Sequence, residues 1–289
     1  MDYGSVTSEG DGSVEQMTRV EAAAPGRAAR GTWDPARWVT DNDRERSRTS
    51  HGLGDLRRAL DAAGSDEVTR FLDVGCGYGG LSRLVGDYLG AAQVHGVDID
   101  ERVVPEAVSK AVEVTLQDAS AQPLPFDDGS FDAVMTLGMM DYLVSFDGIV
   151  RELNRVICDG GWLLVTLPNL ASWHNRLGLL LGYQPRDVEI SSEILAGVAP
   201  GYGGEPPAGH IHIPTTKAFT ELMTHHGFET VALLGGRPRM NPTHPVLAGV
   251  DRVLSRRPSL ARRFYYVGRK VSRPAAQERT VDMPYQSLA

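Results

Sequence analysis

The chain has 289 residues, a formal net charge of −8 and a pI near 5.5. Its 42% hydrophobic and 23% charged residues are ordinary for a globular protein with one large core. The acidic balance disfavours a nucleic-acid partner, because phosphate binding needs a dense basic face. Two cysteines, Cys76 and Cys158, make no disulfide framework and favour a reducing cytoplasm. The apolar run at residues 177–181 is too short to span a bilayer, so we expect no stable membrane association.

Residues 1–30 show no apolar period and no signal-peptide pattern, which predicts a disordered leader. Residues 31–66 predict a helical segment or lid, with leucines at helical spacing and Gly64 at its end. From residue 67 to 273, short apolar runs alternate with helical stretches, which predicts a doubly wound α/β domain. Residues 274–289 are again predicted to be disordered.

The apolar runs predict strands at residues 70–74, 93–97, 112–117, 131–136, 161–167, 229–234 and 264–271. The gaps between them predict helices at residues 80–89, 103–110, 146–156 and 216–226. Thr215 or Thr216 is the expected N-cap of the last helix, and Gly227 is its expected stop. An insert at residues 169–214 and a helical, arginine-rich insert at residues 237–263 break the alternation. Such inserts usually lie over an active site.

The segment from Asp73 to Gly80 carries the strongest functional signal. An apolar strand ends in the carboxylate of Asp73, and a turn with alternating glycines at Gly75, Gly77 and Gly79 then leads into a helix. Glycines allow a sharp turn and let a ligand lie against bare backbone. The N-terminus of the following helix offers amide groups and positive potential to an anionic group.

Three interpretations of this loop stay open. It is a tight turn without a ligand, a dinucleotide loop, or a loop for S-adenosylmethionine. Gly75, Gly77 and Gly80 also satisfy G-x-G-x-x-G, which alone is a weak signal. A pyrophosphate would be repelled by Asp73, whereas S-adenosylmethionine carries an ammonium and a sulfonium that favour a nearby anion. The charge pattern therefore favours the methyl donor over a nicotinamide dinucleotide.

The ends of the next strands support a ligand at the same edge of the sheet. Asp98 follows the glycines by about 20 residues, where such folds bind ribose hydroxyl groups. Ile99 is expected to pack on adenine, and Asp118 to accept a hydrogen bond from the adenine amino group. The fourth strand ends at Leu137, on the same rim, where open α/β sheets bind ligands.

The segment from Asp73 to Gly79 resembles the first motif, acid-x-G-x-G-x-G, of class I S-adenosylmethionine-dependent methyltransferases. Blocks at residues 123–126, 131–134 and 159–165 also resemble that family, in the expected order. The resemblance covers roughly residues 68–271. It implies a Rossmann-like seven-stranded sheet with a reversed last strand and helical cap insertions. The cofactor-binding residues expected on this basis are Asp73, Gly75, Cys76, Gly77, Gly79, Asp98, Ile99, Asp118, Ala119, Leu137, Gly138 and Met139.

Blocks at residues 167–169, 173–176 and 209–212, followed by Phe219, resemble the MetW-like branch of the methyltransferases. The long leader and the arginine-rich insert depart from that branch and favour an enzyme that acts on a specialised metabolite. His210 and His174 lie in the insert expected to cover the reacting methyl group, so they are the candidate bases, with a structural role as the alternative. No metal is expected, since the cysteines and histidines lack metal-ligand spacing.

The predicted activity is transfer of a methyl group from S-adenosyl-L-methionine to an oxygen or nitrogen of a small molecule, ahead of a carbon. S-adenosyl-L-homocysteine would be the product. Two alternatives remain, a MetW-like cofactor-binding partner protein without activity of its own and a nicotinamide-dependent oxidoreductase. The arginines between residues 237 and 273 form a solvated helix face, or bind an anionic substrate or a membrane surface. The acceptor and the oligomeric state are not predicted.

Overall fold

The computed structural model describes residues 30–43, 52–64, 66–200, 206–236 and 245–274. Most of the predicted leader and tail, and the arginine-rich stretch 237–244, lie outside these residues. The described strands form one sheet in the order β3-β2-β1-β4-β5-β7-β6. They are β1 (Arg70–Val74), β2 (Gln93–Asp98), β3 (Glu113–Leu116), β4 (Phe131–Leu137), β5 (Ile157–Pro168), β6 (Phe228–Gly235) and β7 (Arg263–Lys270).

Strand β7 runs antiparallel to both of its neighbours, β5 and β6, while the pairs among β1 to β5 are parallel. The predicted doubly wound sheet with a reversed last strand is therefore confirmed. The largest error in the predicted strands is at β5, which begins at Ile157 and not at residue 161. Ile157 pairs with Phe131 before a register shift, so the strand continues through an irregular stretch that contains Gly160.

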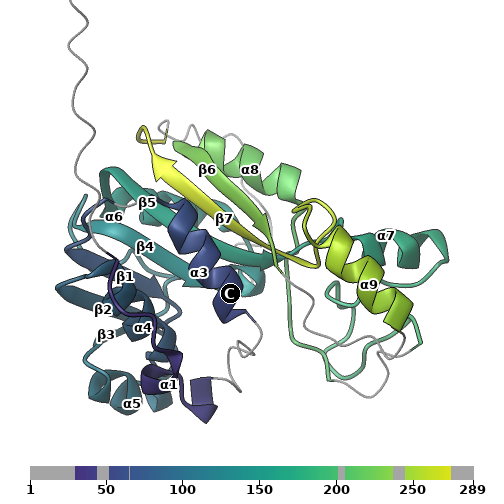
Figure 1. Ribbon diagram of the computed structural model, residues 1–289, viewed down its shortest axis with the longest axis horizontal. Helices are drawn as coiled ribbons and strands as arrows, with labels where there is room; N and C mark the ends of the chain where they lie inside the picture. Colours follow the sequence, from purple (N-terminus) through teal and green to yellow (C-terminus); the bar gives the residue numbers. More distant parts are fainter. Residues whose placement is uncertain (1–29, 44–51, 65, 201–205, 237–244, 275–289) are drawn as a thin grey trace, which may run out of the picture.

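Most of the described helices and turns lie on the two faces of the sheet, while α7 and α9 lie beyond one end of it (Figure 1). They are α1 (Pro35–Trp38), α3 (Leu53–Ala62), α4 (Gly80–Leu89), η2 (Glu101–Val103), α5 (Val104–Ser109), η3 (Met140–Tyr142), α6 (Phe146–Val156), α7 (Trp173–Leu180), α8 (Thr216–His225) and α9 (Pro245–Leu254). The helix predicted at residues 103–110 is a 3₁₀ turn followed by α5. The ring of Pro105 is well placed in the first turn of a helix, where its missing N–H has no partner to lose. As predicted, the Thr215 hydroxyl caps α8 by accepting from the Ala218 amide.

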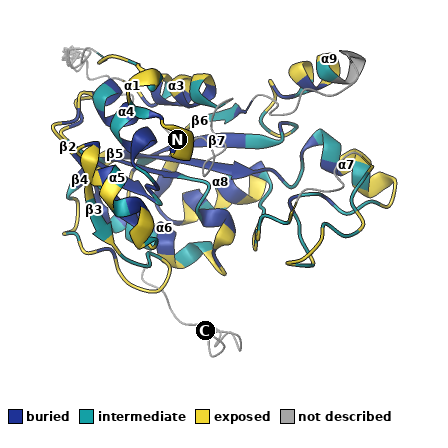
Figure 2. Cartoon of the chain, turned by 90° about the horizontal axis from the view of Figure 1, so that it is seen from below, coloured by how far each residue is buried: buried dark blue, intermediate teal, exposed yellow. Residues whose placement is uncertain are grey.

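Two apolar layers hold the helices to the sheet. Phe71 of β1 points into the layer with α3 and α4, while its neighbour Leu72 points into the layer with α6 and α8. This alternation is what a sheet covered on both faces requires. Figure 2 shows the central strands buried between helices whose outer faces are exposed. The carboxyl ends of β1, β2, β4 and β5 meet at one rim of the sheet. Because β7 is reversed, its first residue, Arg263, pairs with Pro168 at that same rim.

Candidate active site

The loop between β1 and α4 folds against the tip of β2. The amides of Gly75 and Cys76 donate to the carbonyl of Val97, at 2.7 and 3.1 Å. Gly75 has a φ of +85°, and a Cβ placed there would lie 3.0 Å from the Cβ of Met139. Only glycine meets both conditions without strain. The loop therefore presents bare backbone to the space above the sheet, as the sequence predicted.

Asp73 is buried beside this loop. Its Oδ2 accepts a hydrogen bond of 2.6 Å from the Ser82 hydroxyl, and Oδ1 has no hydrogen-bond partner among the described residues. Burial raises the pKa of Asp73 to about 7, with the Ser82 hydrogen bond opposing the shift and the charge of Asp98 adding to it. A buried carboxylate with an unused oxygen is suited to a cationic ligand.

The tips of β2 and β3 supply further polar groups. Asp98 accepts from the amides of Gly77 at 2.8 Å and Asp100 at 3.0 Å. Asp118 accepts from the amide and hydroxyl of Ser120, at 2.8 and 2.6 Å. The hydroxyl hydrogen bond is the main reason that the pKa of Asp118 lies below its usual range. Both carboxylates are thus fixed in place as acceptors.

One cavity of ≈ 870 Å³ brings the expected residues together. It is lined by Asp73, Gly75, Cys76, Gly77, Asp98, Ile99, Asp118, Ala119, Leu137, Gly138 and Met139. Gly79 is the exception among the expected cofactor residues. A Cβ at Gly79 would lie 2.8 Å from the Cα of Ala107, so this glycine lets α4 and α5 approach each other. A cavity of this size suits a small-molecule ligand.

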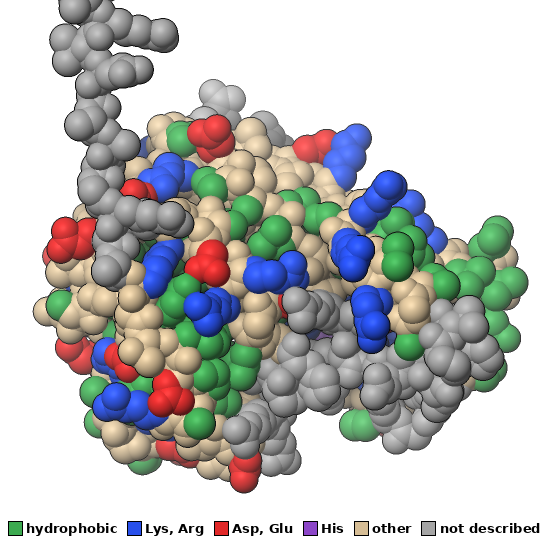
Figure 3. Space-filling model, in the orientation of Figure 1, with side chains coloured by type: hydrophobic (Ala, Val, Ile, Leu, Met, Phe, Trp, Pro, Cys, Tyr) green, Lys and Arg blue, Asp and Glu red, His purple; other side chains and the backbone are tan. Residues whose placement is uncertain are grey.

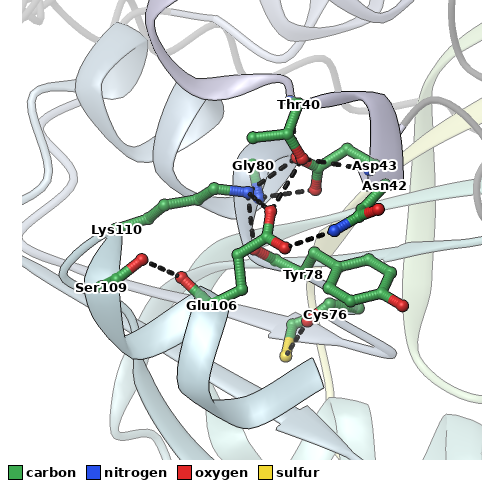
Figure 4. Close-up of polar contacts among 10 residues, drawn as sticks. Thr40, Asn42, Asp43, Cys76, Tyr78, Gly80, Glu106, Ser109 and Lys110 are labelled. Atoms are coloured by element: carbon green, nitrogen blue, oxygen red, sulfur yellow. Dashed lines mark hydrogen bonds and ion pairs between the residues drawn. The ribbon is translucent and has the colours of Figure 1, made fainter. Parts of the chain in front are cut away.

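The N-terminus of α4 differs from the expectation that it would receive an anionic group of the ligand. The Gly80 amide donates instead to Oδ1 of Asp43, at 2.9 Å. Figure 4 shows Asp43 and Glu106 converging on the amine of Lys110, each with an oxygen 2.7 Å from Nζ. Lys110 also donates to the carbonyl of Tyr78 at 2.9 Å. The helix terminus is therefore neutralised by a carboxylate of the chain itself.

The Asp43 contact was not predicted from sequence. Asp43 lies 37 residues before Gly80, in the stretch predicted only as a helical segment or lid. It also lines the cavity, together with Gly52, Leu53, Asp55 and Leu56. The N-terminal segment thus contributes to the wall of the cavity, and its role as a lid stays a prediction.

His210 also lines this cavity, and it lies between two carboxylates. Its Nε2 is 3.3 Å from Oδ2 of Asp141, and its Nδ1 is 3.6 Å from Oε1 of Glu189. The backbone carbonyl of Asp141 accepts from the amides of Ile211 and His212, which holds the histidine loop to η3, just after β4. Around this histidine, residues 206–215 form an irregular loop.

The two carboxylates beside His210 are fixed by their surroundings. Oε1 and Oε2 of Glu189 accept from the amides of Ala208 and Gly209, at 2.8 and 2.6 Å. Asp141 is 1% exposed, and its Oδ1 has no hydrogen-bond partner among the described residues. Burial raises the pKa of Asp141, while Arg263 and His210 oppose the shift. Sequence reasoning missed both acids, because neither stands in a motif.

His174, the second candidate base, lies apart from this site. Its ring stacks on Trp173 at a centroid distance of 3.8 Å, and its Nε2 is 3.5 Å from Oδ1 of Asp251. It is not among the described residues that line the cavity. The structure therefore brings His210, and not His174, to the candidate active site.

The arginines of the second insert divide between the cavity and the surface. Arg262 and Arg263 line the cavity together with Arg186. Arg186 and Arg262 both face Asp187, at 3.5 and 3.7 Å. In the part of the chain that the structure describes, no group of three His, Cys, Asp or Glu residues is arranged to hold a metal ion.

Comparison with known proteins places the glycine loop in a recurring domain. A family model described as a methyltransferase domain matches residues 72–165. A demethylmenaquinone methyltransferase of Thermus thermophilus is 34% identical over 113 residues, which are 38% of this chain and 51% of that protein. A sterol 24-C-methyltransferase of Gibberella zeae is 34% identical over 128 residues, covering 39% of this chain and 33% of the relative. The chain thus spans between a third and a half of these relatives.

Solved structures extend the likeness to the whole fold. A Haloferax volcanii methyltransferase in complex with the activator Trm112 covers 83% of this chain and 99% of its own, with a TM-score of 0.57 and 16% identity. A Thermotoga maritima S-adenosylmethionine-dependent methyltransferase is described as a possible histamine N-methyltransferase. It covers 83% of this chain and 100% of its own, with a TM-score of 0.52 and 18% identity. At such identities the likeness concerns the fold alone.

Proposed function

Since the chain belongs to the class I S-adenosylmethionine-dependent methyltransferases, we propose that it methylates an oxygen or nitrogen of a small molecule. One observation carries the proposal: the glycine loop and His210 line the same cavity. A ligand on the loop and an acceptor beside His210 would therefore meet within one enclosure. Holding two reactants in line can supply about 7–11 kcal/mol of the barrier in the best cases.

The loop side of the cavity fits S-adenosylmethionine better than a dinucleotide. Asp73 offers an unused buried oxygen to a cation. The amides of Gly77 and Gly80 donate to Asp98 and Asp43. A pyrophosphate would need those amides and would face carboxylates in their place. We therefore rank the oxidoreductase below the methyltransferase.

Within this proposal, the bound donor supplies a methyl group on a positively charged sulfur. Asp73 holds a positive group of the donor, while Asp98 and Asp118 accept hydrogen bonds from its ribose and adenine. Ile99, which is 66% exposed beside the loop, covers one face of the adenine. Leu137, Gly138 and Met139 also line the cavity and complete the proposed donor site.

His210 takes the proton that the acceptor loses. An imidazole nitrogen accepts it from the hydroxyl or amine, and the charges of Asp141 and Glu189 stabilise the imidazolium. Asp141 also fixes the histidine loop through its backbone carbonyl, so it acts as a positioning residue as well. A carbon acceptor is the second candidate, because relatives matching this chain include a sterol 24-C-methyltransferase and a sterol 4-C-methyltransferase. A specialised metabolite acted on in the cytoplasm belongs to the same proposal.

The test has two stages. Mass spectrometry of the purified chain should find carried-over S-adenosylmethionine or S-adenosylhomocysteine. Isotope-labelled donor, incubated with panels of phenols, carboxylic acids, amines and quinols, should then yield an acceptor that gains one methyl group. Tight donor binding without turnover of any acceptor, together with a stable complex with another enzyme, would favour the MetW-like partner protein instead. Binding of a nicotinamide dinucleotide in preference to S-adenosylmethionine would refute the proposal.

A further inference from the structure

The first insert carries an exposed apolar surface that the proposed reaction does not use. We call it the cap face, and its residues are Leu177, Leu179, Leu180, Leu181, Ile190 and Ile194. Leu180 is 82% exposed and Ile190 75% exposed. Leu177, Leu180 and Leu181 are spaced three and four residues apart, so they share one side of α7 and its end. Figure 3 shows apolar side chains gathered at the end of the molecule that carries α7. A cluster of large exposed side chains marks an interaction surface.

Basic side chains stand next to the cap face, although the chain as a whole is acidic. Arg176 on α7, Arg252 on α9, and Arg256 and Arg257 after α9 are exposed. Among described residues 173–200 and 248–262, Glu193 is the one exposed acid, because Asp187 and Asp251 are buried and the side chain of Glu189 is 6% exposed. Four arginines against one glutamate make this end positive, while the whole chain carries −8.

Helices α7 and α9 are joined, so the apolar and basic parts form one unit. The indole Nε1 of Trp173 donates to Oδ1 of Asp251 at 2.8 Å, and the Trp173 amide donates to the Leu260 carbonyl at 3.0 Å. The guanidinium of Arg176 reaches the Ser259 carbonyl at 3.4 Å. Figures 1 and 2 show both helices at the same end of the molecule, beyond the sheet.

We propose that the cap face is a reversible docking surface for a bilayer that contains anionic lipids. Leucine and isoleucine side chains enter the boundary between headgroups and acyl chains, and the arginines bind the headgroup phosphates. A second copy of the chain is a poorer occupant, because a twofold contact would bring the four arginines against themselves. Docking of this kind is distinct from spanning, and among the described residues no helix is long and apolar enough to cross a membrane.

The docking surface is built from the same inserts that wall the acceptor side of the cavity. Arg186, Asp187 and His210 come from the first insert and Arg262 from the second, and all four line the cavity. Docking would therefore bring the acceptor side of the enzyme to the lipid surface. An acceptor dissolved in the bilayer could then enter without crossing bulk water. This consequence rests on the proposed function, whereas the docking itself does not.

The test is cosedimentation of the full chain with large vesicles, without methyl donor or acceptor. Vesicles of phosphatidylcholine with about one third phosphatidylglycerol should bind the chain, and pure phosphatidylcholine should bind it much less. Binding should fall steeply at about 1 M NaCl, where the Debye length is about 3 Å. The double variant Arg252→Glu/Arg256→Glu should bind at least roughly 30-fold more weakly, from about 1 kcal/mol per arginine near an anionic surface. Lys217→Glu, at an exposed position on α8, is the matched control and should bind as the parent does.

The apolar contribution is tested separately. Leu180→Ser/Leu181→Ser should weaken binding by about tenfold or more, whereas Val108→Ser, at an exposed apolar position on α5, should not. These positions are on the surface, so circular dichroism and thermal unfolding should match the parent. The proposal is overturned if anionic vesicles do not bind the chain, or if both double variants bind as well as their controls. It is also overturned if the leucine variant turns a dimer into a monomer while vesicle binding is unchanged. A failure of methyl transfer leaves these outcomes unaffected.

Discussion

Replacing Asp73 by asparagine keeps the shape of the side chain and removes its charge, which separates ligand binding from folding. In the folded chain the pKa of Asp73 is raised from 3.8 to about 7, mainly by burial. Folded protein therefore retains a proton that the unfolded chain releases between those pH values. The free energy of unfolding of the parent falls as pH rises through this window, by about 1.4 kcal/mol per pH unit. Below about pH 4, Asp73 is protonated in both the folded and the unfolded chain, so it does not lower the free energy of unfolding.

Asparagine does not ionise, so the variant lacks the pH-dependent loss of stability that a buried Asp73 causes in the parent. Relative to the parent, its free energy of unfolding should grow by about 2.5 kcal/mol between about pH 5 and pH 8 and then level off. The penalty summed over the whole window is roughly 4 kcal/mol for this fully buried group. The variant should nevertheless lose most of its affinity for S-adenosylmethionine, because the carboxylate that meets a cation is gone. A change that stabilises the free protein and abolishes binding cannot be explained by unfolding.

Urea unfolding at about pH 5 and about pH 8 measures the change in stability. Titration calorimetry with S-adenosylmethionine measures the donor affinity. In the parent, affinity should rise about tenfold from about pH 6 to pH 8 as Asp73 ionises, and this rise should be absent in the variant. Asp128→Asn, at a half-exposed carboxylate paired with Arg155, is the control and should change neither quantity appreciably. Unchanged affinity in Asp73→Asn at the higher pH would refute the assigned role of this residue.

Three further changes test other parts of the site. His210→Gln should lower kcat by about 10²–10⁴ with donor affinity unchanged, in a steady-state assay with the acceptor found by screening, and equal kcat would remove His210 as the base. Asp43→Ala should lower the free energy of unfolding by about 2 kcal/mol, because α4 loses its cap and Lys110 a partner. The exposed Asp34→Ala in the same segment should change it by less than about 0.5 kcal/mol, and equal effects would contradict this account. Gly75→Ala should lower the melting temperature and donor affinity together, since it forces a side chain into positive φ and against Met139; a variant with parental donor affinity would show that the loop tolerates a side chain.

The fold could be predicted from sequence because the apolar period within each segment agrees with the alternation of strands and helices along the chain. Strand β1 and helices α4 and α6 have the predicted bounds, since each has a clear apolar period and a clear start and stop. The bounds of β5 could not be predicted, because Asp159 and Gly160 interrupt its apolar run while the backbone still pairs with β4. The residues predicted at the carboxyl ends of the strands do line one cavity, because parallel strands end at the same rim of the sheet.

The acceptor side was less predictable, because it depends on contacts between segments far apart in the chain. His210 and His174 lie in the same predicted insert. One faces Asp141 in η3, and the other faces Asp251 on α9. No local pattern distinguishes the two cases. The Asp43 carboxylate at the start of α4 was missed for the same reason.

The reversed direction of β7 has an evolutionary consequence. Because this strand starts at the rim where its neighbours end, the second insert leaves the sheet at Gly236 and rejoins it at Arg263 beside the cavity, where the first insert also leaves the sheet at Pro168. Insertions or deletions in either segment can reshape the acceptor pocket while the register of every strand is preserved. The residues proposed to bind the donor lie between 73 and 139, inside the 72–165 stretch that the family model matches. Lineages can thus exchange one half of the active site by altering loop lengths and inherit the other half intact.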